Sequence, residues 1–410
     1  MVVQPDQSTF RSYLLFFGGQ MVSLLGSSIA QFVVILWVTL TTGSAFLTSM
    51  AAFAGLVPMV LLMPVAGVLV DRADRRRFIA IVDFIQAMTT VALILAFWTN
   101  FVSIWVVLAL IGLRGVCQAF HLPAVNSIVP AMVPKVKLSR MNGLNFVLFG
   151  AIQLAAPATA ALLLLFASVD QILWLDPITF LAALAALLVV RIPRVNADKP
   201  KGSFRKDFAE GLGFIIHKHG LVPLFVLATA LNFLLAPLSG LISYFIIYDH
   251  LGNASMLALV LTSLQGGILV GGLVMSILKD IKRKIKMSLI FVLAIFLGYV
   301  IVALAPVGSF WLLAAAVAAM GLALAPANVL ITTVIQTIVP LEMMGRVDSA
   351  SSSISSAATP IGFLLSGVLV GFVGTNNLFL ACAIAGIALV AISLLFTDVA
   401  SVDQPAPQDS

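Results

Sequence analysis

The chain has 410 residues, of which 61% are hydrophobic and only 9% are charged, and its formal net charge is +6. A soluble domain carries about 25% charged residues and about 45–50% apolar ones. The composition therefore excludes a soluble globular protein and indicates that lipid surrounds most of the chain.

Apolar segments long enough to cross a bilayer, about 20 residues each, recur along the whole sequence. None shows the alternating polarity of barrel strands, and only helices otherwise satisfy the backbone in hydrocarbon. The fold class is therefore an all-α integral membrane protein with twelve transmembrane helices. The predicted spans are 13–40, 46–70, 78–99, 102–133, 142–166, 171–192, 222–248, 256–278, 287–306, 310–338, 349–373 and 377–397.

The basic residues lie on one side of the predicted membrane. Every lysine and arginine except Arg114 precedes span one, lies in the connections after spans two, four, six, eight and ten, or, in the case of Arg191, lies at the inner end of span six. Cytoplasmic segments of membrane proteins carry such an excess. We therefore predict a multi-pass protein of the cell membrane with both termini cytoplasmic, and no nucleic-acid partner despite the positive charge.

The longest connection follows span six and divides the chain into two halves of six spans. We predict an N-terminal bundle (1–193), a cytoplasmic linker (194–221), a C-terminal bundle (222–397) and a short polar cytoplasmic tail (398–410). Within the linker, Phe204, Phe208, Leu212 and Ile215 follow helical spacing between basic residues, which predicts an amphipathic helix. This helix either lies on the inner membrane surface or packs on the bundle.

The two halves resemble each other in sequence. The stretch VPKVKLSR (133–140), after span four, matches VPLEMMGR (339–346), after span ten. Prolines follow in spans five and eleven at nearly the same distance. These matches indicate a parallel repeat of six helices.

The stretch GVLVDRADRRR (67–77), between spans two and three, carries a family resemblance. With its Gly, Leu, Asp-Arg and basic cluster, the chain resembles the major facilitator superfamily, although Asp74 replaces the second glycine of the motif. The amino-acid sequence of spans one to four is most similar to the macrolide-efflux branch of drug:proton antiporters. The resemblance implies two six-helix bundles and secondary transport.

The same resemblance implies a conformational gate on the inner side, formed by Gly67, Asp71, Arg72, Arg75 and Arg76. In the family the loop aspartate, here Asp71, meets the N-terminus of span eleven when the inner side is closed. The alternative is that the loop is a solvated anchor that fixes membrane orientation.

Arg114 lies about midway along span four, where burying a charge in the bilayer costs about 3 kcal/mol or more. Gln118 and His121 follow on the same helical face, so this face should line a cavity. The resemblance implies a role in proton coupling, and the alternative is a structural arginine.

Two carboxylates also lie within spans, Asp83 and Asp176. Asp176 precedes Pro177 and receives less weight because it could cap a kink. Asp83 is either a proton carrier or a static tie, and His121 a proton carrier or a packed polar residue.

Isolated polar residues in the apolar spans are candidates for a substrate cavity. They are Gln31, Gln118, Asn145, Gln153, Asn232, Tyr244, Gln265 and Asn328. The alternative is that they form hydrogen bonds between helices.

We expect a secondary transporter that exports hydrophobic drug-like compounds, macrolide-type or multidrug, by proton antiport and alternating access. No Gly-rich loop ending in Gly-Lys and no His-Glu-x-x-His pair is present, so we expect neither an enzyme nor a catalytic residue or metal site. The expected partners are a small hydrophobic substrate, protons and the lipid bilayer; the proton gradient replaces a cofactor, and the chain acts as a monomer. The alternatives are an exporter of a siderophore-like metabolite or a lipid, or a channel or non-transporting sensor.

Overall fold

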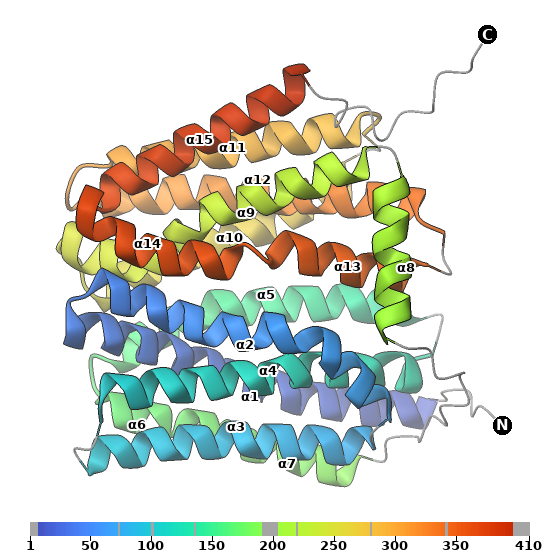
Figure 1. Cartoon of the computed structure of the whole chain (residues 1–410). Helices are drawn as coiled ribbons and strands as arrows, with labels where there is room; N and C mark the ends of the chain where they lie inside the picture. The colour runs from blue at the N-terminus through green and yellow to red at the C-terminus, as the bar shows by residue number, and fades with distance from the viewer. Residues whose placement is uncertain are drawn as a thin grey trace. The chain divides into compact units, whose positions relative to one another are not determined.

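The computed structural model in Figure 1 describes residues 7–72, 74–99, 102–134, 137–190, 204–218, 220–278, 281–340 and 343–396. Within these ranges all regular structure is helical, and each of the twelve predicted spans is a helix long and apolar enough to cross a membrane. The chain forms two compact units, Met1–Lys201 and Gly202–Ser410. Their boundary falls inside the segment predicted as a linker, whereas the predicted tail lies outside the described residues.

The N-terminal unit contains the first six spans, and the sixth is broken. Its helices are α1 (Gln7–Thr42), α2 (Ala45–Arg72), α3 (Arg75–Trp98), α4 (Ile104–Met132), α5 (Leu138–Leu163), α6 (Val169–Leu173) and α7 (Leu175–Val189). Helix α1 packs on α5 and α7, α2 packs on α4, and α3 packs on α4 and α7. Helix α1 also contacts α4, so spans four and six both contact spans one and three.

The C-terminal unit repeats this pairing. Its helices are α8 (Phe204–His217), α9 (Leu221–Tyr244) with a π-helical end η2 (Phe245–Asp249), α10 (Ala254–Ile277), α11 (Lys284–Leu304), α12 (Phe310–Ile338), α13 (Met344–Ser356), α14 (Thr359–Val373) and α15 (Thr375–Phe396). Helix α9 packs on α14 and α15, α10 on α12, and α11 on α12 and α15. The equivalent spans of the two units thus meet in the same combinations.

Glycines allow the closest of these crossings. A methyl group at Gly115 of α4 would lie 2.2 Å from the carbonyl oxygen of Gly55 in α2, and one at Gly321 of α12 would lie 2.2 Å from that of Leu264 in α10. Gly115 and Gly321 are separated by the same number of residues as Pro134 and Pro340 of the sequence repeat. In lipid, such small residues let helix backbones approach closely. The repeat therefore preserves the contact that brings span two onto span four.

Span eleven breaks between α13 and α14. Pro360, the second residue of α14, has no N–H to continue the helical hydrogen bonds. Two side chains of α9 satisfy carbonyl groups at the break: Thr229 Oγ1 donates to Ile354 O (3.0 Å) and Asn232 Nδ2 donates to Ser355 O (3.1 Å). Span seven therefore holds the end of α13 in place.

The predicted amphipathic helix is present as α8 and packs on the bundle. Figure 1 shows α8 running across α13, and the two helices are in contact. Glu210 forms an ion pair with Arg346, and Gly211 lies against the carbonyl group of Arg346. Because Ile215 is 2% exposed, the apolar face of α8 is covered by protein rather than by the membrane surface alone.

These crossings predict a large penalty for added volume. We expect Gly115→Ala and Gly321→Ala each to lower the free energy of unfolding by about 1–3 kcal/mol, because the methyl group meets backbone atoms that cannot move alone. Thermal unfolding of the purified protein in detergent measures the loss. Gly143→Ala is the matched control, since its methyl group would meet open space. Equal stability of all three variants would contradict the packing argument.

Candidate functional site

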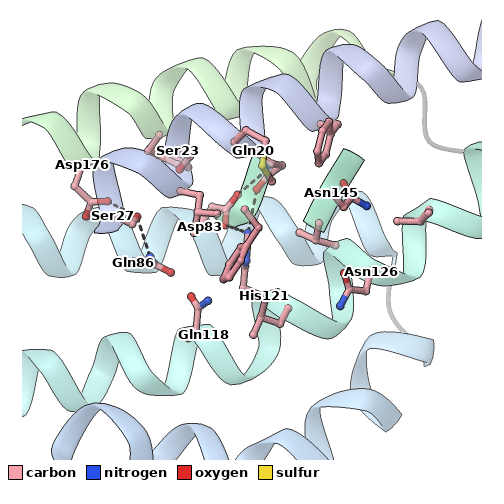
Figure 2. A pocket seen from close by; sticks show the side chains of 18 of the residues that line it. Gln20, Ser23, Ser27, Asp83, Gln86, Gln118, His121, Asn126, Asn145 and Asp176 are labelled. Atoms are coloured by element: carbon pink, nitrogen blue, oxygen red, sulfur yellow. Dashed lines mark hydrogen bonds and ion pairs between the residues drawn. The ribbon is translucent and has the colours of Figure 1, made fainter. Parts of the chain in front are cut away.

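A pocket of about 330 Å³ lies inside the N-terminal unit, between α1, α3, α4, α5 and α7. Figure 2 shows its polar side chains, which are Gln20, Ser23, Ser27, Asp83, Gln86, Gln118, His121, Asn126, Asn145 and Asp176. The rest of the lining is apolar, with Tyr13, Phe17, Met21, Leu24, Ala87, Leu122, Val125, Val129, Phe146, Phe149 and Phe180. Such a mixture suits a hydrophobic ligand that carries a few polar groups.

Arg114 of α4 forms an ion pair with Asp176 of α7. Arg114 Nη1 lies 2.5 Å from Asp176 Oδ2, and the aspartate is 2% exposed. Ser27 Oγ of α1 donates to Asp176 Oδ1 (2.5 Å), and Thr90 of α3 also donates to the carboxylate. Gln86 Nε2 donates in turn to Ser27 Oγ (3.2 Å). The buried pair is therefore charge-balanced and hydrogen-bonded by four helices.

The break in span six explains how Asp176 reaches this position. Helix α7 begins at Leu175, so Asp176 lies in its first turn, where the helix dipole stabilises a negative charge. Pro177 is tolerated there because the first-turn N–H groups have no helical partner. We expected Asp83 rather than Asp176 to be the more important carboxylate beside Arg114, yet the ion pair is with Asp176.

Asp83 has a different partner. His121 Nε2 lies 3.0 Å from Asp83 Oδ1 and 3.1 Å from Gln20 Oε1. Gln20 Nε2 lies 3.4 Å from Asp83 Oδ2 and donates to it. Asp83 is 8% exposed and Gln20 is 4% exposed. Figure 2 shows the three side chains converging from α1, α3 and α4. Since both neighbours of His121 Nε2 are acceptors, this nitrogen carries a proton.

The two clusters form two layers of the same construction. Helix α1 contributes Gln20 and Ser27, α3 contributes Asp83 and Thr90, and α4 contributes His121 and Arg114, each pair seven residues apart. Seven residues are two helical turns, or about 10 Å. The sequence analysis missed Gln20, Ser27 and Thr90, although the spacing from Asp83 to Thr90 repeats that from Arg114 to His121.

The charged loop after α2 is tied to its own unit. Asp74, the departure from the family motif, caps α3: its carboxylate accepts from the backbone N–H of Arg76 (3.1 Å) and Arg77 (3.2 Å). Arg75 Nη1 donates to Ser127 O of α4 (2.9 Å), and Arg76 donates to the last carbonyl groups of α7. The surroundings of Gly67 and the side chains of Asp71 and Arg72 lie outside the described structure, so the predicted gate stays a prediction.

The predicted cavity residues separate into three groups. Gln118 and Asn145 line the pocket. Gln153 accepts a hydrogen bond from Ser28 (3.1 Å), and Asn232 bonds the break in span eleven, so both make contacts between helices. Gln31 and Asn328 are exposed, Gln265 is half-buried, and Tyr244 stacks on Tyr248 with ring centroids 5.2 Å apart.

Twelve helices long and apolar enough to cross a membrane, with charged side chains paired around a pocket inside the N-terminal unit, define a multi-pass membrane protein. The model of the Major Facilitator Superfamily matches residues 16–347 and 229–410, and the chain belongs to this family of transporters.

Several relatives are similar over most of their length. Macrolide efflux protein A of Streptococcus pyogenes is 29% identical over 390 residues, which cover 94% of this chain and 96% of the relative. The multidrug efflux pump Tap of Mycobacterium tuberculosis is 27% identical over 365 residues, 86% of each chain. Among solved structures, the nucleoside transporter NupG (D323A mutant) matches with a TM-score of 0.73 at 14% identity, covering 93% of this chain and all of that one. A bacterial homologue of the iron transporter ferroportin matches with a TM-score of 0.71 at 17% identity, covering 96% and 99%. The two solved structures share the fold, and the two relatives named above are efflux proteins.

The ion pair predicts a recognisable stability pattern. We expect Arg114→Met to lower the free energy of unfolding by about 3–5 kcal/mol, because it leaves Asp176 buried without its cation. Arg114→Met combined with Asp176→Leu should recover most of the loss, since no buried charge remains. Thermal unfolding in detergent compares the two variants. A double variant no more stable than the single one would show that Arg114 and Asp176 do not form an energetic pair.

Proposed function

We propose that this chain exports hydrophobic, drug-like compounds in exchange for protons by alternating access. The observation that carries the proposal is the pairing inside the pocket: a buried carboxylate, Asp83, contacts a titratable partner, His121, beside an apolar lining. The family and the efflux relatives support transport and export. Inward movement of one proton supplies about 2.3 kcal/mol per 100 mV of membrane potential, so no cofactor is needed.

The two layers divide the work of coupling. Asp176 has a permanent cation and two hydroxyl donors, so it stays ionised and holds α1, α3, α4 and α7 together. Asp83 has only a histidine and an amide, whose charge and orientation can change. Proton exchange is therefore assigned to Asp83 and His121, with Arg114 and Asp176 as the fixed charge beside them.

The lining of the pocket supports a hydrophobic substrate. Five aromatic rings face it, together with side-chain amides that can donate or accept hydrogen bonds. Its volume of about 330 Å³ is near the lower end for ligand pockets. A macrolide-type compound would therefore place only one part of the molecule there, whereas smaller drugs of a multidrug pump would fit more completely.

The charged loop supplies the gate of this proposal. Arg75 and Arg76 fix the start of α3 to α4 and α7. Gly67 and Arg72 complete the motif at the end of α2. Asp71 then acts as the charge that closes the inner side.

Proton coupling is tested in proteoliposomes with the purified protein. We expect extrusion of a fluorescent lipophilic dye or a labelled macrolide when the compartment facing the outer side is acidified, and loss of that response in Asp83→Asn. Asp170→Asn is the control, because Asp170 lies at the start of α6 and accepts a hydrogen bond from Trp98 (2.9 Å) outside the pocket. Unchanged proton-driven transport in Asp83→Asn would remove Asp83 from the mechanism. Movement of lipid or an iron chelate, with no movement of drug or dye, would replace the substrate class.

The gate is tested by a change of charge at nearly constant volume. Asp71→Asn should slow transport while leaving orientation unchanged, because the arginines that fix orientation remain. Transport rate and the protease sensitivity of a C-terminal tag, measured on the same vesicles, separate the two effects. A variant with the wild-type rate would reduce the loop to an orientation anchor.

A further inference from the structure

A second group of buried polar side chains lies in the C-terminal unit, where span seven turns into span eight. His250 is 1% exposed and Thr375, the first residue of α15, is 4% exposed. Asp249 Oδ2, His250 Nδ1 and Thr375 Oγ1 are all buried, and His250 Nδ1 has no hydrogen-bond partner among the described residues. Thr375 and His250 both lie near the Asp249 carboxylate. Buried polar atoms are almost always paired, so this cluster requires an explanation.

The backbone holds the cluster in an unusual shape. Helix α9 ends in the π-helical turn η2, in which His250 N–H donates to Phe245 O (3.0 Å) and Gly252 N–H donates to Ile246 O (2.8 Å). Leu251 has a φ of 57°, a left-handed conformation that is uncommon for a residue with a side chain. Single π-turns are rare and often occur at functional sites. The turn sets His250 inward, while Leu251 is 79% exposed.

Aromatic rings surround the histidine, and no second charge faces it. The His250 ring lies 4.4 Å from that of Phe245 and 6.4 Å from that of Phe310, the first residue of α12. Helices α10, α12 and α15 contain no charged residue or histidine, and the two lysines of α11 lie at its first turn, Lys284 and Lys286. The phenol of Tyr244 lies near Asp249 and stacks on Tyr248, and Tyr299 packs on Phe379. Asp249 is therefore the one charged group close to His250 in the described part of this unit.

The donor set identifies the ligand class. A structural zinc site takes four ligands from cysteine, histidine or carboxylate, and this cluster supplies two. A site for an alkali or alkaline-earth cation is built from oxygen atoms, and an imidazole nitrogen does not suit it. A carboxylate beside an imidazole with a free ring nitrogen does suit a proton.

We propose that Asp249, His250 and Thr375 form a proton-binding site in the C-terminal unit, separate from the pocket of the N-terminal unit. A proton from water binds His250 Nδ1, the ring keeps the proton on its other nitrogen, and the Asp249 carboxylate balances the new positive charge. The Thr375 hydroxyl orients the carboxylate. In the predicted orientation this turn faces the outer side, so the site responds to the pH outside the cell.

Burial favours the neutral form of the His250 side chain. Desolvation lowers the pKa of His250 below its usual value, and the Asp249 carboxylate opposes this effect. The unfolded chain takes up the proton near the ordinary histidine pKa of about 6.5. Below that pH the unfolded state binds more protons than the folded state, so stability falls as the pH decreases.

The direct test is a histidine-selective ¹⁵N NMR titration of the whole protein in nanodiscs. The chain has 4 histidines, so few signals need to be assigned, and His250→Gln identifies its own by loss of that signal. We expect the His250 signal to titrate with a midpoint below the ordinary histidine value of about 6.5. Asp249→Asn should lower the midpoint further, by about one pH unit, because the balancing charge is removed.

The outcomes separate this proposal from a purely structural histidine. A His250 signal that does not move with pH overturns it, and so does a midpoint at the ordinary histidine value of about 6.5 that Asp249→Asn leaves unchanged. Thr375→Val gives a second reading if Asp249→Asn does not fold, since loss of the hydroxyl should also move the midpoint.

Thermal unfolding supplies an independent measurement. Wild-type protein should lose more stability than His250→Gln between about pH 7 and pH 5, whereas the control His217→Gln should follow the wild type. Equal losses in wild type and His250→Gln would overturn the link between this proton and folding. Neither experiment depends on transport, so failure of the proposed export function would leave the result readable.

Discussion

The arrangement of the N-terminal unit depends on one ion pair, between Arg114 and Asp176. A charge near the middle of a bilayer costs about 3 kcal/mol or more, so Arg114 requires a partner inside the bundle. Asp176 supplies it, and the break between α6 and α7 places that carboxylate in the first turn of a helix. Ser27 and Thr90 complete its hydrogen bonds from two further helices. The pair thus fixes how four spans are rotated relative to one another.

This pairing decides what the neighbouring carboxylate can do. With Arg114 bound to Asp176, Asp83 has no permanent cation and is held by His121 and Gln20 two helical turns away. One layer therefore has a fixed charge, and the other has a charge that depends on a histidine. An exchange reaction needs both properties, because a proton carrier must change its state without loosening the helices around it.

Hydropathy was sufficient to predict the twelve spans, since lipid imposes the same requirement on every span. The matching stretches 133–140 and 339–346 predicted the internal repeat. The helix in the linker was also predictable, but its packing through Glu210 and Gly211 on α13 was not. The partners of the charged residues could not be predicted, because Arg114 and Asp176 meet only through the rotation of α4 against α7. Asp74 illustrates a local rule that family comparison obscures: a residue that departs from the motif is an ordinary helix cap.

The two units show that backbone packing and interior chemistry vary independently. Gly115 and Gly321 make equivalent close crossings, yet the repeat places Met320 where Arg114 stands. In place of the ion pair, the C-terminal unit packs Phe245, Tyr299 and Phe379 with ring centroids 5.0–5.4 Å apart. Aromatic contacts need no charge balance, and the acidic and basic groups at the turn after α9, Asp249 and His250, lie beside them without an arginine or lysine partner in the described part of this unit. The internal repeat therefore accounts for the helix packing of both bundles, whereas the buried charged groups are not repeated and differ from one bundle to the other.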